Sequence, residues 1–573
     1  MCLPSTICSL KLLESLDLFG CSKFDNLPKN LGNVEALKKL DLSGTAITEL
    51  PSSIERLTCL TSLTLLYCYK LTCLPNTTCG FKFRGALDLS TCLRFKKLPK
   101  NPWIIEGLKM LDLSKTVIEE LPSSIKHLTN RTSLNLRYCM NLVRLPSTIC
   151  SLRLLNSLDL FGCLKFDSLP ENIGNIKGLE VLNLCWIAIK EVPSSIVLLK
   201  NLKQLNIHGW KLSDFYSQPA SLESMTPLQT SSIFLPTSPP RKILLPSFLY
   251  FSLPTSPVPM GLLFSTLSGL QSLTYLYLRD CDLLSIPNDI GCLSSLQCLN
   301  LSGNNFVSLL KSMSQLSNLQ ILCMEGCKRL QSLENVLSTI DSVIANDCIS
   351  LERLPELQFY PLRSNHSHLN FQCLNCFELV DYIQSGGNMF QLSLSLSVSS
   401  IRFVFIFQGL SGRLLDLLET IIPGREIPKW FNHECMGHEL NIQVPSSECD
   451  DVMEIALCAA FVPKKSLPRF SICRLSCSLN GVQMKHCVYS GFRTNYGIIE
   501  SHHLWLLYYS NYTLNDGRIS SEIDANGFCQ LKIKIDSQSF EGKKIGVHLV
   551  YWQDIEDPYQ TKALCINNNS MFL

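Results

Sequence analysis

Residues 155–170 read LNSLDLFGCLKFDSLP, and the fold of most of the chain follows from this stretch. Leu155, Leu158 and Leu160 form the pattern LxxLxL, in which alternate residues of a short strand face opposite sides. Cys163 comes next and is small enough for the interior, and a Leu-Pro pair at residues 169–170 fixes the backbone. The pattern predicts a strand with its leucines turned inward, then a turn, then a tighter outer segment.

The same frame recurs along the chain in steps of 23 or 24 residues. The residue before the proline, a leucine or its near-equivalent valine, stands at Leu27, Leu50, Leu74, Leu98, Leu121, Leu145, Leu169 and Val192. Cys21, Cys92 and Cys163 are 71 residues apart, which indicates that three repeats were copied as a block. A fixed period of this length with this pattern resembles the leucine-rich repeat.

The frame predicts thirteen units. They are expected to stack, because a single unit is not stable alone. One unit buries about eight apolar side chains worth roughly 2 kcal/mol each, whereas ordering its backbone and side chains costs about 1.5 kcal/mol per residue. Strands are predicted around Leu16, Leu40, Leu63, Leu87, Leu111, Leu134, Leu158, Leu182, Leu205, Leu276, Leu299, Leu322 and Val343. The predicted fold is an α/β leucine-rich-repeat solenoid, a horseshoe with a parallel sheet on its concave face, followed by an all-β sandwich.

Five segments of the chain differ in pattern. A first block of repeats covers residues 1–212, a Pro/Ser-rich insertion or loop covers 213–261, and a second block of repeats covers 262–358. A connector with an apolar insertion is expected at 359–420. Short alternating or apolar runs, separated by Gly, Asn, Asp and Ser, then predict a β-sandwich at 421–573.

Composition excludes several classes of partner. The chain has 50 basic and 48 acidic side chains, so no overall field favours nucleic acid or an anionic membrane. The apolar stretch at 389–410 is interrupted by Arg402 and alternates Ser with Leu, which favours a strand over a membrane-spanning helix. Many of the 28 cysteines occupy repeat positions, so no disulfide framework is expected and the chain is predicted to be reduced and intracellular.

No catalytic residue, cofactor or metal is predicted. The phosphate loop GxxxxGK[ST] and the motifs GxSxG and HExxH do not occur in the sequence. His433, Cys435 and His438 lack a nameable fourth metal ligand, and the pair Cys373 and Cys376 lacks a partner pair. The carboxylates at 450–451, which a glycan-active enzyme could use, are adjacent and would diverge along a strand.

Function is therefore expected in a surface. The exposed strand positions of the predicted concave face carry aromatic and charged side chains, namely Phe19, Tyr67, Arg137, Tyr138, Phe161, Trp186, His208, Tyr275, Tyr277 and Arg279. Tyr, Trp and Arg are enriched where proteins bind one another tightly. Scattered surface aromatics are the alternative interpretation, since such residues are common. Repeat solenoids bind partners through such extended faces, which favours binding for the face as a whole.

Two sequence blocks resemble plant intracellular immune receptors of the TIR-NB-LRR class. The repeat frame is similar to the repeats of that class, and residues 422–446, IPGREIPKWFNHECMGHELNIQVPS, resemble the jelly-roll/Ig-like domain (C-JID) that follows them. Supporting matches are the runs that begin at Ile455, Ser501 and Lys544. The residues that match the C-JID motif, expected to be mainly structural, are Pro423, Gly424, Glu426, Ile427, Pro428, Trp430 and Phe431.

The resemblance implies a recognition module that is not an enzyme. Such a module would bind a pathogen effector or a guarded host protein through the repeats and the C-JID together, in the cytoplasm and possibly the nucleus. In a full receptor, the repeats would also contact the receptor's own TIR and nucleotide-binding domains. Neither of those domains is present in this sequence, so no NAD-hydrolysing or nucleotide-switch activity is implied. A truncated receptor remnant or decoy, acting only as a protein-protein interaction scaffold, is the alternative.

Overall fold

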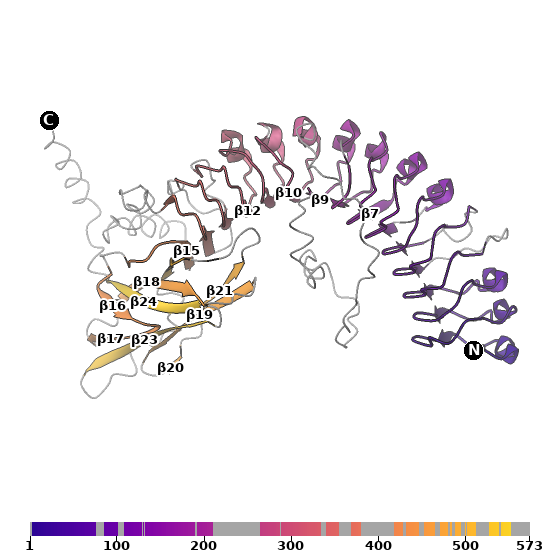
Figure 1. Cartoon of the computed structure of the whole chain (residues 1–573), viewed down its shortest axis with the longest axis horizontal. Coiled ribbons are helices and arrows are strands. Elements are labelled where there is room, and N and C mark those ends of the chain that lie inside the picture. The colour runs from indigo at the N-terminus through magenta and orange to yellow at the C-terminus, as the bar shows by residue number, and fades with distance from the viewer. Residues whose placement is uncertain are drawn as a thin grey trace. The chain divides into compact units, whose positions relative to one another are not determined.

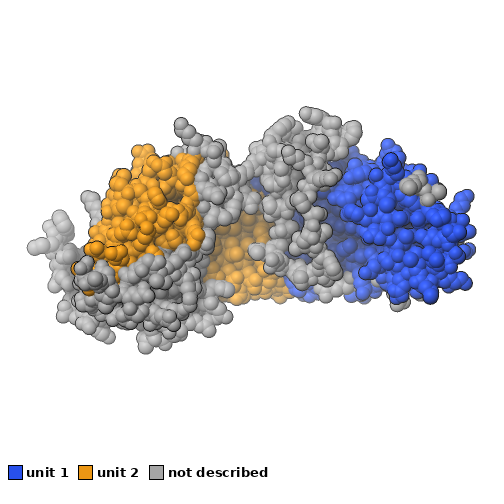
Figure 2. Space-filling view, turned by 90° about the horizontal axis from the view of Figure 1, so that it is seen from below, with its two compact units in different colours: residues 1–270, 280–282 blue, residues 271–279, 283–573 orange. Residues whose placement is uncertain are grey.

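The computed structural model describes residues 3–75, 85–100, 108–128, 130, 132–189, 192–209, 264–286, 288–333, 340–353, 368–379, 417–427, 431–445, 452–464, 470–479, 482–483, 488–493, 499, 501–510, 527–537 and 540–551. The predicted insertion at 213–261 and the apolar stretch at 389–410 lie outside these ranges. The chain divides into two compact units (Figure 2). Unit 1 comprises residues 1–270 and 280–282, and unit 2 comprises residues 271–279 and 283–573.

Unit 1 is built from repeats whose strands form a parallel sheet (Figure 1). The strands are β1 (Ser15–Asp17), β2 (Lys39–Asp41), β3 (Ser62–Thr64), β4 (Ala86–Asp88), β5 (Met110–Asp112), β6 (Thr132–Asn135), β7 (Leu155–Asp159), β8 (Val181–Cys185) and β9 (Gln204–His208). Each strand pairs with the next so that the predicted central leucines, from Leu16 to Leu205, stand in register. All nine strand centres predicted for this unit are confirmed.

The outer side of the coils in unit 1 consists of short 3-10 helices. They are η1 (Ser5–Ser9), η2 (Leu31–Asn33), η3 (Ser52–Arg56), η5 (Ser123–His127), η6 (Ser147–Ser151), η7 (Ile173–Asn175), η8 (Ser194–Leu198) and η9 (Phe264–Gly269). Proline stands directly before several of them, with φ of −66° at Pro51 and −65° at Pro146, because its fixed φ suits the entry to a helical turn. The predicted tighter outer segment is therefore present as a 3-10 helix.

Apart from Cys21 of the first unit, which is exposed, the repeat-position cysteines of the described ranges lie inside the coils, and several donate hydrogen bonds to the backbone. The Sγ atom of Cys68 is 3.1 Å from the carbonyl oxygen of Leu42, and the same bond joins Cys163 to Leu136 at 3.0 Å. Where threonine replaces cysteine, as at Thr116, its hydroxyl donates within its own turn. These contacts explain why the position takes a small side chain with a donor. Cysteines in the described part of the chain carry free thiols.

Unit 2 begins with six parallel strands. They are β10 (Tyr275–Arg279), β11 (Cys298–Asn300), β12 (Ile321–Cys323), β13 (Ser342–Ile344), β14 (His368–Gln372) and β15 (Leu417–Pro423). The 3-10 helices η10 (Asn288–Cys292) and η11 (Lys311–Gln315) lie on the outer side. The remaining four predicted centres, from Leu276 to Val343, are confirmed. Strands β14 and β15 fall where a connector was expected, because Phe371 and Thr420 stand in register where the frame has leucine.

The predicted β-sandwich completes unit 2. One sheet continues from β15 through β22 (His503–Ser510), β18 (Val452–Pro463), β24 (Phe540–Tyr551) and β16 (His433–Met436), all antiparallel. The second sheet contains β17 (Glu439–Pro445), β23 (Phe528–Ser537), β19 (Phe470–Leu479), β20 (Val482–Gln483) and β21 (Val488–Arg493). Buried side chains such as Trp505, Leu475 and Ile533 fill the core of this sandwich. Within the described ranges, no helix has the length and apolarity needed to cross a membrane.

Candidate protein-binding surface

The turn that follows each repeat strand has a left-handed residue at a fixed place. An Asp or Asn at the strand end holds this turn, as where Oδ1 of Asp159 accepts the backbone N–H of Phe161 at 3.0 Å. The residue that follows this N–H donor, three positions after the Asp or Asn, then adopts positive φ. Glycine fills the position at Gly162, but Tyr138 and Trp186 occupy it with φ of 57°. Non-glycine residues rarely adopt this conformation, and in this chain the repeat turn also holds Thr91 and Lys115 in it.

Four rings from successive repeats form a continuous row, which we call the aromatic row: Tyr138, Phe161, Trp186 and His208. The ring centroids of Tyr138 and Phe161 are 5.2 Å apart with the rings edge to face. Phe161 and Trp186 are 5.0 Å apart, and Trp186 and His208 are 5.9 Å apart. These spacings fall in the range in which aromatic pairs stabilise one another beyond simple burial. The row follows the edge of the sheet at the carboxyl ends of the strands.

Gly162 makes room for the first ring of the row. A Cβ atom at this position would lie 2.7 Å from Cδ1 and 3.0 Å from Cε1 of Tyr138. The Tyr138 ring therefore lies against the backbone of the next repeat, where any larger residue would displace it. Glycine suits this position because it has no side chain to meet the ring and because it adopts the φ of 72° at little cost.

Cationic side chains lie over the row. The guanidinium of Arg137 is 4.7 Å from the Phe161 ring centroid, and its NH1 is 3.6 Å from Oδ2 of Asp159. The ammonium of Lys115 is 5.9 Å from the Tyr138 ring centroid. Burial raises the pKa of Asp159, and the positive charge of Arg137 opposes that rise. Phe161 is only 8% exposed, in contrast to the expected exposure, because its neighbours in the row and Arg137 cover it.

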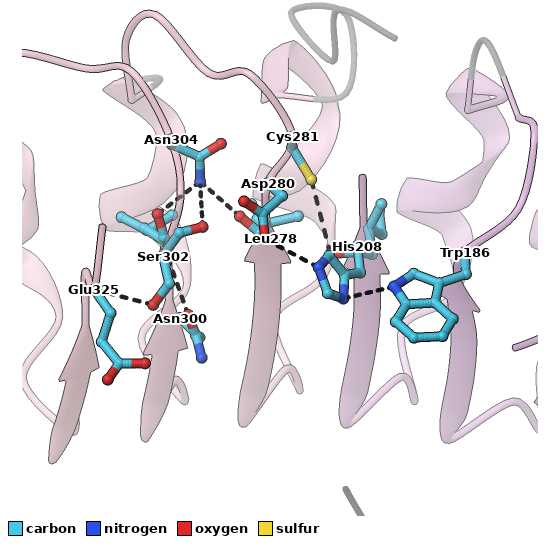
Figure 3. Close-up of polar contacts among 11 residues, drawn as sticks. Trp186, His208, Leu278, Asp280, Cys281, Asn300, Ser302, Asn304 and Glu325 are labelled. Carbon is cyan, nitrogen blue, oxygen red and sulfur yellow. Dashed lines mark hydrogen bonds and ion pairs between the residues drawn. The ribbon is translucent and has the colours of Figure 1, made fainter. Parts of the chain in front are cut away.

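The far end of the row is held by directional hydrogen bonds (Figure 3). The indole N–H of Trp186 donates to Nδ1 of His208 at 3.1 Å, and Nε2 of His208 lies 3.0 Å from Oδ2 of Asp280. An indole nitrogen can only donate a hydrogen bond, so Nδ1 of His208 must accept it. The ring proton is therefore on Nε2, which donates a hydrogen bond to Asp280. Asp280 is buried, although it stands 72 residues beyond His208.

The structure brings most predicted surface residues into two groups. Arg137, Tyr138, Phe161, Trp186 and His208 meet in unit 1, at the turns beyond the strands and at the end of β9. In the same unit, Tyr67 occupies the left-handed position after β3, with its ring centroid 6.1 Å from that of Tyr69, and Phe19 is 65% exposed.

The second group lies on β10 of unit 2. Tyr275, Tyr277 and Arg279 alternate with the buried Leu276 and Leu278, as the predicted strand pattern requires. Tyr275 is exposed, and burial raises the pKa of Tyr277.

Sequence reasoning missed Lys115, Asp159 and Asp280, which contact the aromatic row. Lys115 occupies the left-handed turn position one repeat before Tyr138. Asp159 stands two residues before Phe161, the spacing at which a carboxylate holds a turn. The period of the repeat could have identified both residues. Asp280 also occupies the left-handed turn position, after β10 with φ of 50°, but the segment at 210–263 separates it from His208 in sequence.

The described residues of the C-JID motif occupy structural positions. Ile427 and Phe431 are each 4% exposed. A Cβ atom at Gly546 would lie 2.6 Å from Cγ2 of Ile427 and 3.1 Å from Cγ of Phe431, so both side chains press on the β24 backbone. Pro423 ends β15, and a Cβ at Gly424 would lie 2.8 Å from a methyl group of Leu504.

Of the three remaining motif residues, only Glu426 lies within the described ranges. The Glu426 side chain is exposed, and its Oε2 lies 3.9 Å from Nζ of Lys544. Pro428 and Trp430 lie outside the described residues.

The two candidate metal motifs have other roles in the structure. Cys435 on β16 donates its thiol hydrogen to the carbonyl oxygen of Glu439 at 3.0 Å. Cys376 donates to the carbonyl oxygen of Ala345 at 3.0 Å, as the repeat-position cysteines do. Across the described ranges, three or more His, Cys, Asp or Glu residues nowhere converge in a way that could hold a metal ion.

Comparison with known families identifies both parts of the molecule. Residues 422–556 match the C-JID domain and residues 272–293 match the Leucine Rich Repeat. The chain carries leucine-rich repeats and a C-JID domain. The predicted resemblance to disease-resistance receptors is thereby confirmed for these two parts.

Curated relatives of these repeats and this C-JID domain are plant resistance proteins. Disease resistance-like protein DSC1 of Arabidopsis thaliana is 32% identical over 425 residues, which cover 73% of this chain and 30% of the relative. TMV resistance protein N of Nicotiana glutinosa is 40% identical over 147 residues, covering 25% of this chain and 13% of that protein. Disease resistance protein RPP2B of Arabidopsis thaliana is 31% identical over 183 residues, which cover 31% of this chain and 14% of that protein. The chain thus spans less than a third of the length of these relatives.

Solved structures with similarity to this chain include other repeat proteins. A leucine-rich-repeat protein of Leptospira interrogans is 25% identical with a TM-score of 0.37, and the match covers 64% of this chain and 71% of that chain. The functional domain of InlJ from Listeria monocytogenes is 18% identical with a TM-score of 0.35, covering 64% and 68%.

Proposed function

We propose that this chain is a non-enzymatic recognition module of a plant intracellular immune receptor. It binds a pathogen effector or a guarded host protein through the predicted concave face of its repeats and through the C-JID. The similarity to plant resistance proteins supports the class of protein, and the aromatic row supports the binding surface. The free thiols that donate hydrogen bonds inside the coils suit a reducing compartment such as the cytoplasm.

The single observation that carries this proposal is the aromatic row. Tyr138 and Trp186 keep half-buried rings in a left-handed backbone conformation, with fixed neighbours on both sides. Side chains that are already ordered lose little conformational entropy when a partner binds. Tyr, Trp and Arg are also the residue types that contribute most to affinity in protein interfaces. The row therefore provides a preorganised contact surface in which each member is held by the next.

A pull-down with candidate pathogen effectors identifies a partner, and titration of that partner then tests the surface. We expect the variant with Tyr138, Trp186 and Tyr277 all replaced by Ala to bind at least about 100-fold more weakly. Leu198→Ala is the matched control, since Leu198 is 42% exposed on η8, on the outer side of the coil. Unchanged affinity in the triple variant refutes this surface. A chain that binds the same host proteins with and without effectors present acts as a constitutive scaffold instead.

A further inference from the structure

The last parallel strand of the repeats is covered along its free edge by the C-JID domain. Strand β15 pairs with β14 on one side and with β22 on the other. The second pairing is antiparallel and extends over seven residues, from Leu417 opposite Tyr509 to Pro423 opposite His503. An uncovered strand edge exposes unpaired N–H and C=O groups, so solenoids need a cap at each end. The repeat sheet therefore passes directly into the C-JID sheet.

His503 joins the same two parts through its side chain. It is 0% exposed, and its Nε2 accepts the backbone N–H of Asn375 at 3.0 Å. Its Nδ1 lies 3.1 Å from the carbonyl oxygen of Ser501 and donates to it. Because a backbone N–H can only donate, the imidazole must be neutral with its proton on Nδ1. The ring also stacks on Phe461 of β18, with centroids 5.9 Å apart and 24° between the planes.

Asn375 is the repeat-side partner and lies in the turn after β14. Its φ is 60°, the left-handed value of the repeat turns, and its own side chain donates to Oδ1 of Asp347 at 2.7 Å. One residue earlier, the backbone N–H of Leu374 donates to Oδ1 of Asn346 at 2.9 Å. The contact of His503 is therefore made to a turn that is tied to the preceding repeat.

A second buried bond crosses the junction beside the first. The indole N–H of Trp505 on β22 donates to Oε1 of Glu419 on β15 at 2.8 Å. Trp505 is 0% exposed and Glu419 is 2% exposed. Breaking a buried bond to a charged group leaves that group poorly solvated. Both bonds therefore favour one fixed arrangement of the sandwich on the last coils.

We propose that the C-JID domain is the C-terminal cap of the repeat solenoid, and that His503 is the positioning residue that fixes it on the Asn375 turn. The last coils of the repeats and the sandwich then unfold and refold together as one cooperative unit. This inference goes beyond partner binding, because it holds whether or not a partner binds the repeats.

Amide hydrogen exchange of the full chain tests the cap, read at the amide of Asn375. In His503→Asn the acceptor at the Nε2 position is lost, and we expect exchange at Asn375 to become about tenfold faster, which corresponds to about 1.4 kcal/mol. In His503→Gln the amide oxygen can reach that position, and we expect exchange within about threefold of the wild-type rate. His502→Gln is the matched control at the half-buried neighbouring histidine, where no change is expected.

The paired variants distinguish a positioning role from a merely packed ring. A general loss of packing accelerates exchange equally in His503→Asn and His503→Gln, and that result overturns the proposal. Unchanged exchange at Asn375 in His503→Asn overturns it as well. If His503→Asn does not fold, Trp505→Phe removes the indole N–H of the second bond together with part of the buried ring. Its expected result is faster exchange in β15, β22 and the Asn375 turn together, and acceleration confined to β22 contradicts a shared body.

Discussion

Trp186 donates its indole N–H to Nδ1 of His208 at 3.1 Å, and this bond fixes both the tautomer of the histidine and the tilt of the indole. The histidine then presents Nε2–H to the carboxylate of Asp280, which is 2% exposed. The exposed part of the aromatic row is thus anchored to a buried acid through one imidazole. The position of the Trp186 ring therefore depends on Asp280, which is buried and would not contact a partner.

Replacing His208 with Phe should destabilise unit 1 by about 1–3 kcal/mol, because Trp186 and Asp280 both lose a buried hydrogen bond. Urea unfolding measures the free energy of unfolding. His208→Gln is the comparison variant, since its amide can still donate to Asp280 and should recover part of the loss. Equal stability of His208→Phe and the wild type contradicts the anchoring role.

Replacing Gly162 with Ala should cost more than the same change at Gly20. Both glycines have φ near 73°, at 72° and 73°, so the backbone cost of about 1 kcal/mol is shared. A Cβ at Gly20 meets nothing within 4 Å, whereas at Gly162 it lies 2.7 Å from the Tyr138 ring. We expect an additional loss of about 0.5–1.5 kcal/mol for Gly162→Ala from the displaced ring. Equal losses in urea unfolding would show that the ring is not held against the backbone.

Stability should fall as pH decreases from about 6.5 toward 4. Burial lowers the pKa of His503 to about 4, and the nearby His502 lowers it further. Between pH 6.5 and 4 the unfolded chain binds a proton at His503 and the folded chain does not. The free energy of unfolding therefore decreases by about 3 kcal/mol on acidification. His503→Gln cannot titrate at this position, so its stability should fall less than that of the wild type over the same pH range. Urea unfolding at pH 7, 5.5 and 4 compares the two chains. Parallel pH profiles contradict a buried neutral imidazole.

Thiol alkylation should separate the buried cysteines from the exposed ones. Burial raises the pKa of Cys139 to about 12, so its thiolate is scarce at pH 8. Cys21 and Cys59 are exposed and should react with iodoacetamide within minutes. Mass spectrometry of digested protein measures the modified fraction at each site with time. Alkylation of Cys139 in folded protein at the rate of Cys59 contradicts its place inside the coil.

The thirteen strand centres could be predicted because each leucine of the frame serves the same purpose in every coil. The frame failed at β14 and β15, where Phe371 and Thr420 take the leucine register and the pattern no longer repeats. Several aromatic side chains of the predicted surface lie side by side in the structure, although not all of them occupy strand positions. Tyr138 and Trp186 stand in left-handed turns, and Phe161 is covered by its neighbours.

The period of the sequence is enough to predict the parallel strands, the inward leucines and a small residue at the cysteine position. A fixed step of 23 or 24 residues returns each side chain to the same place in the next coil, so local pattern and packing carry the same information. The contacts of His208 with Asp280 and of His503 with Asn375 follow instead from the tertiary fold. Those partners are 72 and 128 residues apart, and their contact depends on how the chain returns rather than on any local pattern.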